Sequence, residues 1–198
     1  MGFTATKTVK ITAAATLAMA TLFATAATAQ AMDTTEHTPD GQVVTVYGPS
    51  EVQAAYDAQT SKDKNTPHSA YSDSGPELAA AAASANVCGS GYTISTGAAR
   101  YGTYGTTYTW TNGTSTGSRI YDKPICAVFF NDTGYTRYMG VRLKDNYTST
   151  PDTEDFGAYR SYAGPVYQKK GYCGRVYSYM EIGGKAVVDN YLGVGSCN

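Results

Sequence analysis

From residue 103 to residue 110 the chain alternates small and large side chains. The odd positions hold Gly or Thr, whereas Tyr104, Tyr108 and Trp110 lie at even positions. Successive side chains of a β-strand point to opposite faces of the sheet, so a period of two predicts a strand with one bulky face. The pattern indicates β-structure here rather than helix.

The later part of the chain continues in the same way. Residues 125–130 are apolar throughout, which predicts a strand that is buried on both faces. Residues 139–143 and 176–182 alternate apolar and polar positions, and Gly183-Gly184 after the second segment predicts a tight hairpin turn. No later stretch has the apolar period of a helix. We expect an all-β fold, either a small β-sandwich or a barrel.

The first 31 residues have the three parts of a secretory signal. Lys7 and Lys10 supply positive charge, residues 11–29 are uncharged, and small residues at 27–31 offer cleavage sites. The uncharged segment is rich in Thr and weakly apolar, whereas a membrane span needs about 20 mostly apolar residues. We expect residues 1–31 to be removed and the mature protein to be secreted, without a membrane segment.

Export changes how the cysteines are interpreted. The chain has four, Cys88, Cys126, Cys173 and Cys197, and four cysteines in an exported domain favour two disulfides. They include no Cys-x-x-Cys spacing and have no nearby His, which argues against a metal site. Three pairings are open. We favour Cys88–Cys126 with Cys173–Cys197, because each pair would enclose a local run of strands.

Residues 32–86 differ from the rest of the chain. They are mostly polar, with eight acidic and two basic side chains. Residues 42–47 predict a short strand, and residues 50–61 predict a helix that is too short to be stable alone. We expect a mostly disordered, acidic leader that serves as a spacer or is removed as a pro-segment. A small disulfide-stapled all-β domain would follow at residues 87–198.

The formal net charge of −1 hides an asymmetry between these two parts. Residues 87–198 hold eleven basic and eight acidic side chains, so their charge is opposite to that of residues 32–86. A weakly basic domain has some attraction for anionic wall polymers. The excess is too small to predict binding to nucleic acid.

The position of histidine limits the chemistry of the expected domain. His37 and His68 are the two histidines of the chain, and both precede residue 87. The domain therefore cannot assemble a Ser-His-Asp or Cys-His catalytic site. A histidine-ligated metal is excluded for the same reason, and we expect neither a metal nor a cofactor.

Carboxylates leave two further hypotheses. Residues 145–155 form an oxygen-rich segment of a kind that can hold Ca²⁺, but the spacing matches no EF-hand and a solvated loop is favoured. A glycosidase needs two carboxylates that face each other across a cleft. Asp155 or Glu154 could form such a pair with Glu181. We favour a protein without enzymatic activity.

Tyrosine gives the strongest compositional signal, because 15 of the 18 tyrosines lie after residue 88. Aromatic residues at strand spacing often pack in the core or across strands. There are too many here for a small core to hide, so we expect an exposed aromatic patch that could stack on sugars or cover a partner surface. The candidate ligand-binding aromatics are Tyr104, Tyr108, Trp110, Tyr162 and Tyr167.

Short Gly- and Tyr-rich motifs carry a resemblance to a known family. The motifs are Cys-Gly-Ser-Gly-Tyr at residues 88–92, Ser-Tyr-Ala-Gly-Pro-Val-Tyr at 161–167, Gly-Tyr-Cys at 171–173 and the last cysteine. In these motifs the chain resembles the spore-associated protein A family of Streptomyces and related actinobacteria. The similarity covers residues 88–198. It implies a small secreted protein found with the spore or cell surface, and it assigns no catalytic residue.

These observations lead to one favoured function and two alternatives. We favour a secreted, non-catalytic, monomeric protein of the spore or cell surface, whose partner is a cell-wall polymer or another surface protein and not nucleic acid. The first alternative is a carbohydrate- or cell-wall-binding module that uses exposed Tyr and Trp. The second is a secreted protease inhibitor that presents a disulfide-braced loop.

Overall fold

Strands dominate the computed structural model, which describes residues 34–37, 43–62 and 83–197. The secretory signal expected at residues 1–31 lies outside this part. The elements in chain order are β1 (Thr34–His37), β2 (Val43–Tyr47), α1 (Pro49–Lys62), β3 (Ile94–Tyr101), β4 (Gly105–Thr111), β5 (Ile125–Asn131), β6 (Arg137–Lys144), β7 (Thr153–Tyr159), β8 (Tyr162–Gln168), the 3₁₀ helix η1 (Gly171–Cys173), β9 (Arg175–Ile182) and β10 (Lys185–Gly193). No helix within these residues is long and apolar enough to cross a membrane.

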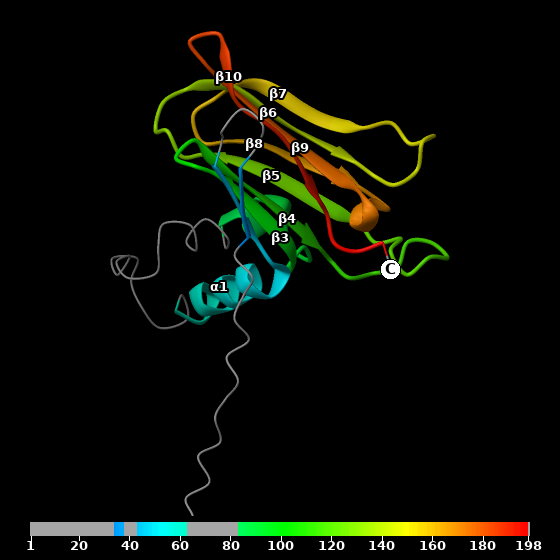
Figure 1. The fold of residues 1–198 in the computed structure, drawn as a ribbon. Helices are drawn as coiled ribbons and strands as arrows, with labels where there is room; N and C mark the ends of the chain where they lie inside the picture. The colour runs from blue at the N-terminus through cyan, green and yellow to red at the C-terminus, as the bar shows by residue number, and fades with distance from the viewer. Residues whose placement is uncertain (1–33, 38–42, 63–82, 198) are drawn as a thin grey trace, which may run out of the picture. The chain divides into compact units, whose positions relative to one another are not determined.

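The strands form two antiparallel sheets, and Figure 1 shows their strands one above the other. One sheet has six strands in the order β1-β2-β3-β4-β5-β8, and the other has four in the order β10-β9-β6-β7. The all-β prediction is confirmed. Because the strands divide into two sheets, the arrangement is a two-layer one and not a single closed barrel.

The main hydrophobic core lies between the inner faces of the two sheets. Met139, Val141 and Leu143 of β6 are fully buried there, at the alternate positions that the sequence pattern predicted. Ile125 and Phe129 of β5 face them from the six-stranded sheet. Each such side chain stabilises the fold by about 1.5–3 kcal/mol through the apolar surface that it removes from water.

A buried group of hydroxyls joins the sheets within this core. Ser178 of β9 accepts a hydrogen bond from the Tyr101 hydroxyl at 3.3 Å, and its Oγ lies 2.6 Å from Oγ1 of Thr107. All three residues are buried. Buried hydroxyls need partners because an unpaired one loses its bonds to water. The group therefore fixes how β9 sits over β3 and β4.

The described parts of residues 32–86 belong to this fold, which corrects the expected domain boundary at residue 87. β2 pairs with β3, with Val44 opposite Tyr101. Helix α1 packs Val52 and Ala55 onto the outer face of the six-stranded sheet. The strand and helix predicted in this region are present, and they are ordered because they pack on the sheet. All described residues lie in one compact unit that spans residues 31–198.

Both disulfides have the favoured pairing. Cys88 is bonded to Cys126, which ties the helical turn at residues 83–88 to β5. Cys173 is bonded to Cys197, which ties η1 to the segment that follows β10. The predicted hairpin turn is also present. Gly183 and Gly184 join β9 to β10 with φ of +61° and +75°, values that side chains other than Gly rarely adopt.

Candidate functional site

The outer face of the four-stranded sheet carries a shallow depression of about 460 Å³. That volume lies in the range of about 300–1,000 Å³ that is usual for ligand sites. We call this surface the aromatic face; its lining residues are Tyr138, Arg142, Phe156, Tyr177, Tyr179, Glu181, Asp189 and Tyr191. None of the five aromatics chosen from the sequence is among them.

Strand register assembles the face in rows that run across the sheet. In one row Arg142 of β6 lies opposite Glu154 of β7 on one side and opposite Tyr177 of β9 on the other. Tyr177 in turn lies opposite Tyr191 of β10. Directly opposed residues on antiparallel strands point to the same face, so four strands contribute to one surface.

The neighbouring row has a glycine at its centre. Gly140 lies between Phe156 of β7 and Tyr179 of β9. A Cβ atom at Gly140 would lie 2.1 Å from Cδ1 of Phe156, so the phenyl ring rests directly on the Gly140 backbone. An aromatic ring that covers a cross-strand glycine protects the exposed backbone there. The glycine is therefore required for the position of Phe156.

Four tyrosine rings form a continuous path over β10, β9 and β6. The ring centroids of Tyr191 and Tyr177 are 4.7 Å apart, and those of Tyr177 and Tyr179 are 6.3 Å apart. Tyr138 continues the path at 6.4 Å from Tyr179. The two end members are the most accessible, with 49% of Tyr138 and 57% of Tyr191 exposed.

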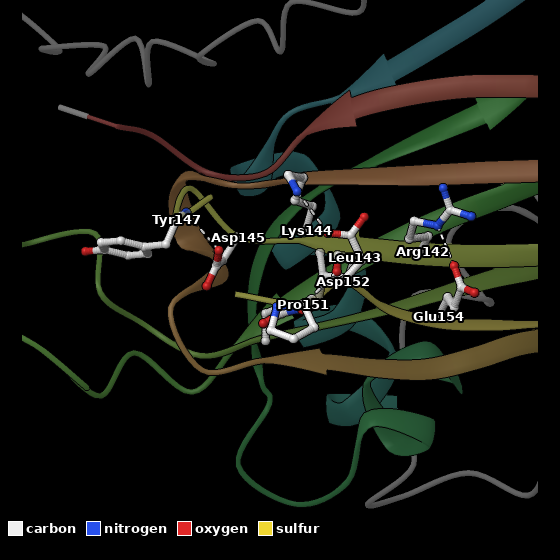
Figure 2. Close-up of polar contacts among 9 residues, drawn as sticks. Arg142, Leu143, Lys144, Asp145, Tyr147, Pro151, Asp152 and Glu154 are labelled. Carbon is white, nitrogen blue, oxygen red and sulfur yellow. Dashed lines mark hydrogen bonds and ion pairs between the residues drawn. The ribbon is translucent and has the colours of Figure 1, made fainter. Parts of the chain in front are cut away.

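Ion pairs lie on the β6–β7 side of the path, and Figure 2 shows the four side chains that form them. The Arg142 guanidinium pairs with Glu154, and Nζ of Lys144 lies 3.0 Å from Oδ1 of Asp152. The same guanidinium lies 5.5 Å from the Phe156 ring centroid and 5.7 Å from that of Tyr177. Arg142 is thus held in place by one carboxylate and two ring faces.

Two other carboxylates accept hydrogen bonds from the tyrosines of β9. The Tyr177 hydroxyl donates to Asp189 at 2.8 Å, and the Tyr179 hydroxyl donates to Glu181. Its bond to Glu181 raises the pKa of Tyr179 from 10.0 to about 12. Burial and the bond to Asp189 also raise the pKa of Tyr177. Both phenols therefore keep their protons at neutral pH and orient the two carboxylates.

Two of the aromatics chosen from the sequence are buried, which corrects their expected role. Trp110 is 0% exposed and its Nε1 donates to Oγ of Ser84 at 2.8 Å. Tyr108 lies in the same cluster under helix α1 and is 3% exposed. Both point to the outer face of the six-stranded sheet, but α1 and the turn at residues 83–88 cover that face. Neither side chain can stack on a ligand in this fold.

The other three chosen aromatics lie apart from the aromatic face. Tyr104 is half-buried at the margin of the inter-sheet core. Tyr162 and Tyr167 are on β8, in the other sheet, where they are 36% and 41% exposed. The Tyr167 hydroxyl donates to the carbonyl oxygen of Cys88.

The carboxylates proposed as a glycosidase pair do not converge. Asp155 lies opposite the buried Val141, so it points toward the core and accepts a bond from the Gly164 amide. Glu154 and Glu181 share the outer face but lie four register positions apart, which is about 13 Å along the strands. A glycosidase needs a separation of roughly 5–9.5 Å. Within the described ranges no three His, Cys, Asp or Glu side chains gather as metal ligands.

Comparisons with protein-family models, with curated proteins and with solved structures find no match to this chain. The fold and the site define a class: a disulfide-bonded, two-sheet β-protein with an aromatic outer face.

Proposed function

We propose that this protein is a secreted, non-catalytic carbohydrate-binding protein that attaches to a polysaccharide of a spore or cell surface through the aromatic face. The observation that supports this most strongly is the path of four tyrosine rings on one sheet surface, with ionic and hydrogen-bonding groups beside it. Sugar rings offer the same combination of apolar C–H faces and polar hydroxyl edges. Tyrosine suits such ligands because it has an apolar body and a polar tip.

The form of the site favours a polymer over a small enclosed ligand. The depression is open and lies on the surface of the sheet, and its two most exposed rings, Tyr138 and Tyr191, are at opposite ends of the path. A chain of sugars can therefore enter and leave along the surface. Tyr177 and Tyr179 are held by their hydrogen bonds to Asp189 and Glu181, so little conformational entropy is lost at these two rings on binding.

The proposed location, the spore or cell surface, rests on other features of the chain. The signal-like residues 1–31 and the two disulfides support export, since disulfides persist in oxidising compartments. The resemblance to the spore-associated protein A family adds the spore or cell surface as the place of action. A carbohydrate-binding protein at that location would have wall polymers within reach.

The test is retention of the purified protein (residues 32–198) on insoluble chitin, cellulose and peptidoglycan. We compare Tyr191→Ala with Tyr135→Ala as a matched control. Tyr135 is 69% exposed and lies 5.3 Å from the Arg137 guanidinium, much as Tyr191 lies 5.6 Å from that of Arg175. Tyr135 is outside the aromatic face.

We expect the Tyr135 variant to bind as the unmodified protein does. The Tyr191 variant should lose about tenfold in affinity, a value at the lower end of the roughly 1–3 kcal/mol that stacking of a nucleic-acid base on one aromatic side chain contributes. No retention on any of these polymers would contradict the proposal, as would equal losses in the two variants.

A second candidate function is protease inhibition through the loop between β4 and β5. Residues 112–120 are all exposed, and Ile120 is 70% exposed. Buried Asp122 braces the loop from below, because it accepts bonds from the Arg119 amide and the Tyr147 hydroxyl. A rigid exposed loop is what such an inhibitor presents. Unchanged protease rates at saturating protein would dismiss this candidate.

A further inference from the structure

The two ends of the aromatic face differ in charge. Arg142 and its row partner Glu154 lie at one end, and Arg175 lies beside Tyr191 at the same end. Glu181 lies opposite Tyr138 at the other end, four register positions away from the arginine row. Asp189 is directly opposite Tyr179, two register positions from Glu181, and the two carboxylates together form the acidic end.

At the arginine end the protein supplies its own cations. Arg142 is paired with Glu154 and lies over two rings, and Arg175 lies 5.6 Å from the Tyr191 centroid. The ring faces and the carboxylate at this end are therefore already matched by positive charge. A ligand has no unpaired group there to neutralise.

The acidic end has the same kinds of acceptor without a cation. Tyrosyl hydroxyls hold Glu181 and Asp189 in place, yet within the described residues neither carboxylate forms an ion pair with Lys or Arg. Nor does any described Lys or Arg lie over the ring of Tyr138 or Tyr179. Two carboxylates and two ring faces thus converge where the protein provides no positive group.

We propose that this end of the aromatic face selects a protonated amine, so that the preferred ligand is a polysaccharide with free amino groups rather than a neutral or N-acetylated one. The inference depends on the proposed carbohydrate-binding function and adds the chemical class of the sugar. An ammonium group can lie over the Tyr138 or Tyr179 ring and at the same time donate a hydrogen bond to Glu181 or Asp189. Cation–π attraction and charge-assisted hydrogen bonds both favour it over an acetamide.

The experiment measures binding of the whole chain to three soluble oligosaccharides of equal length and the same β-1,4 linkage. One consists of glucosamine, one of N-acetylglucosamine and one of glucose, in a mildly acidic buffer that protonates the amines. We expect the glucosamine oligomer to bind about tenfold tighter than the other two, since its ammonium groups gain a cation–π contact and charge-assisted hydrogen bonds that a hydroxyl or acetamide lacks. Added salt should reduce that preference.

Two conservative variants localise the preference. Glu181→Gln and Asp189→Asn keep size and shape but remove the charge, so each should lower affinity for the glucosamine oligomer by more than it lowers affinity for the glucose oligomer. The ratio of the two affinities measures the preference, and circular dichroism checks that the variants are folded. Asp152→Asn is the matched control, because Asp152 is ion-paired to Lys144 beside the face and should not affect the preference.

The outcomes separate the two proposals. If no oligosaccharide binds, the carbohydrate-binding function fails. If all three bind equally, or the N-acetylated one binds best, that function stands and the amine selectivity is overturned. A lysine tetrapeptide that binds at the same site as tightly as the glucosamine oligomer would also overturn it, since the site would then recognise basic protein segments.

Discussion

The outer faces of the two sheets both carry aromatic side chains, but only one of them is covered. On the six-stranded sheet Tyr108 and Trp110 point outward and are buried by helix α1 and the turn at residues 83–88. On the four-stranded sheet Tyr138 and Tyr191 also point outward, and about half of each remains exposed. The same residue type therefore stabilises the fold on one face and is available for binding on the other.

This comparison shows that an aromatic strand pattern does not reveal function by itself. Whether a ring binds a ligand depends on a segment distant in sequence that either covers it or leaves it open. Here α1 (Pro49–Lys62) lies far before β4 (Gly105–Thr111) in the sequence.

The largest expected effect is on the covered face. Trp110→Ala removes a fully buried ring and the bond to Ser84, so it should lower the free energy of unfolding by about 3–5 kcal/mol. Tyr191→Ala on the open face should change it by less than about 0.5 kcal/mol. Urea denaturation followed by far-UV circular dichroism, which does not require the tryptophan, measures the stability of both variants. Equal losses would show that the open face is also structural.

The two disulfides should also differ in how much they stabilise the protein. Cys88–Cys126 encloses 38 residues and lies in the cluster under α1, whereas Cys173–Cys197 encloses 24. Chain entropy alone gives about 3.9 and about 3.4 kcal/mol for the two bonds. Replacing each pair by Ala should therefore destabilise the protein in that order. Thermal unfolding of the two double variants checks this, and the reverse order would contradict the role given to the covered cluster.

A smaller effect is expected from Gly140→Ala on the open face. The new methyl group would collide with Phe156, so the ring must move and the variant should lose about 1–3 kcal/mol of stability. Phe156→Ala in the same molecule removes the collision, and the double variant should be more stable than the sum of the two single changes indicates. A double-mutant cycle by urea denaturation measures this coupling. Additive losses would mean that the ring does not rest on Gly140.

The smallest effect concerns alkaline pH. The pKa of Tyr179 is raised to about 12 in the folded protein, so its bond to Glu181 contributes stability that is complete below pH 10 and is lost as the pH rises toward 12. Tyr179→Phe lacks this contribution. The stability difference between the two proteins should therefore shrink between pH 10 and pH 12, as unfolding curves across that range can show. A constant difference would contradict the assigned hydrogen bond.

Much of the fold could be predicted from the sequence because it depends on local pattern. The alternation in residues 139–143 set the inward face of β6, and Gly183-Gly184 set the β9–β10 turn. The pairing of the four cysteines also followed from the strands that they enclose. The packing of α1 could not be predicted, since its short sequence has few apolar residues. These residues indicate that one side of the helix is buried, but not which surface it contacts.

The site was less predictable for a related reason. The alternation of β9 placed Tyr177, Tyr179 and Glu181 on one side of a strand, but their neighbours depend on which strands pair. In the sheet the strand order is β10-β9-β6-β7. Tyr138 of β6 and Phe156 of β7 therefore join the face because of strand pairings that no local sequence signal specifies. Trp110 was a misleading candidate because its pattern matches that of an exposed strand residue.

Binding at the aromatic face is tested most directly by a nuclear magnetic resonance titration of the whole chain with a soluble β-1,4-linked oligosaccharide. We expect the backbone amides of β6, β9 and β10 to shift together, with the largest changes around Tyr177, Tyr179 and Tyr191. Changes confined to residues 112–120, to β8 or to the covered face around Trp110 would contradict it, because binding would then not involve the open face.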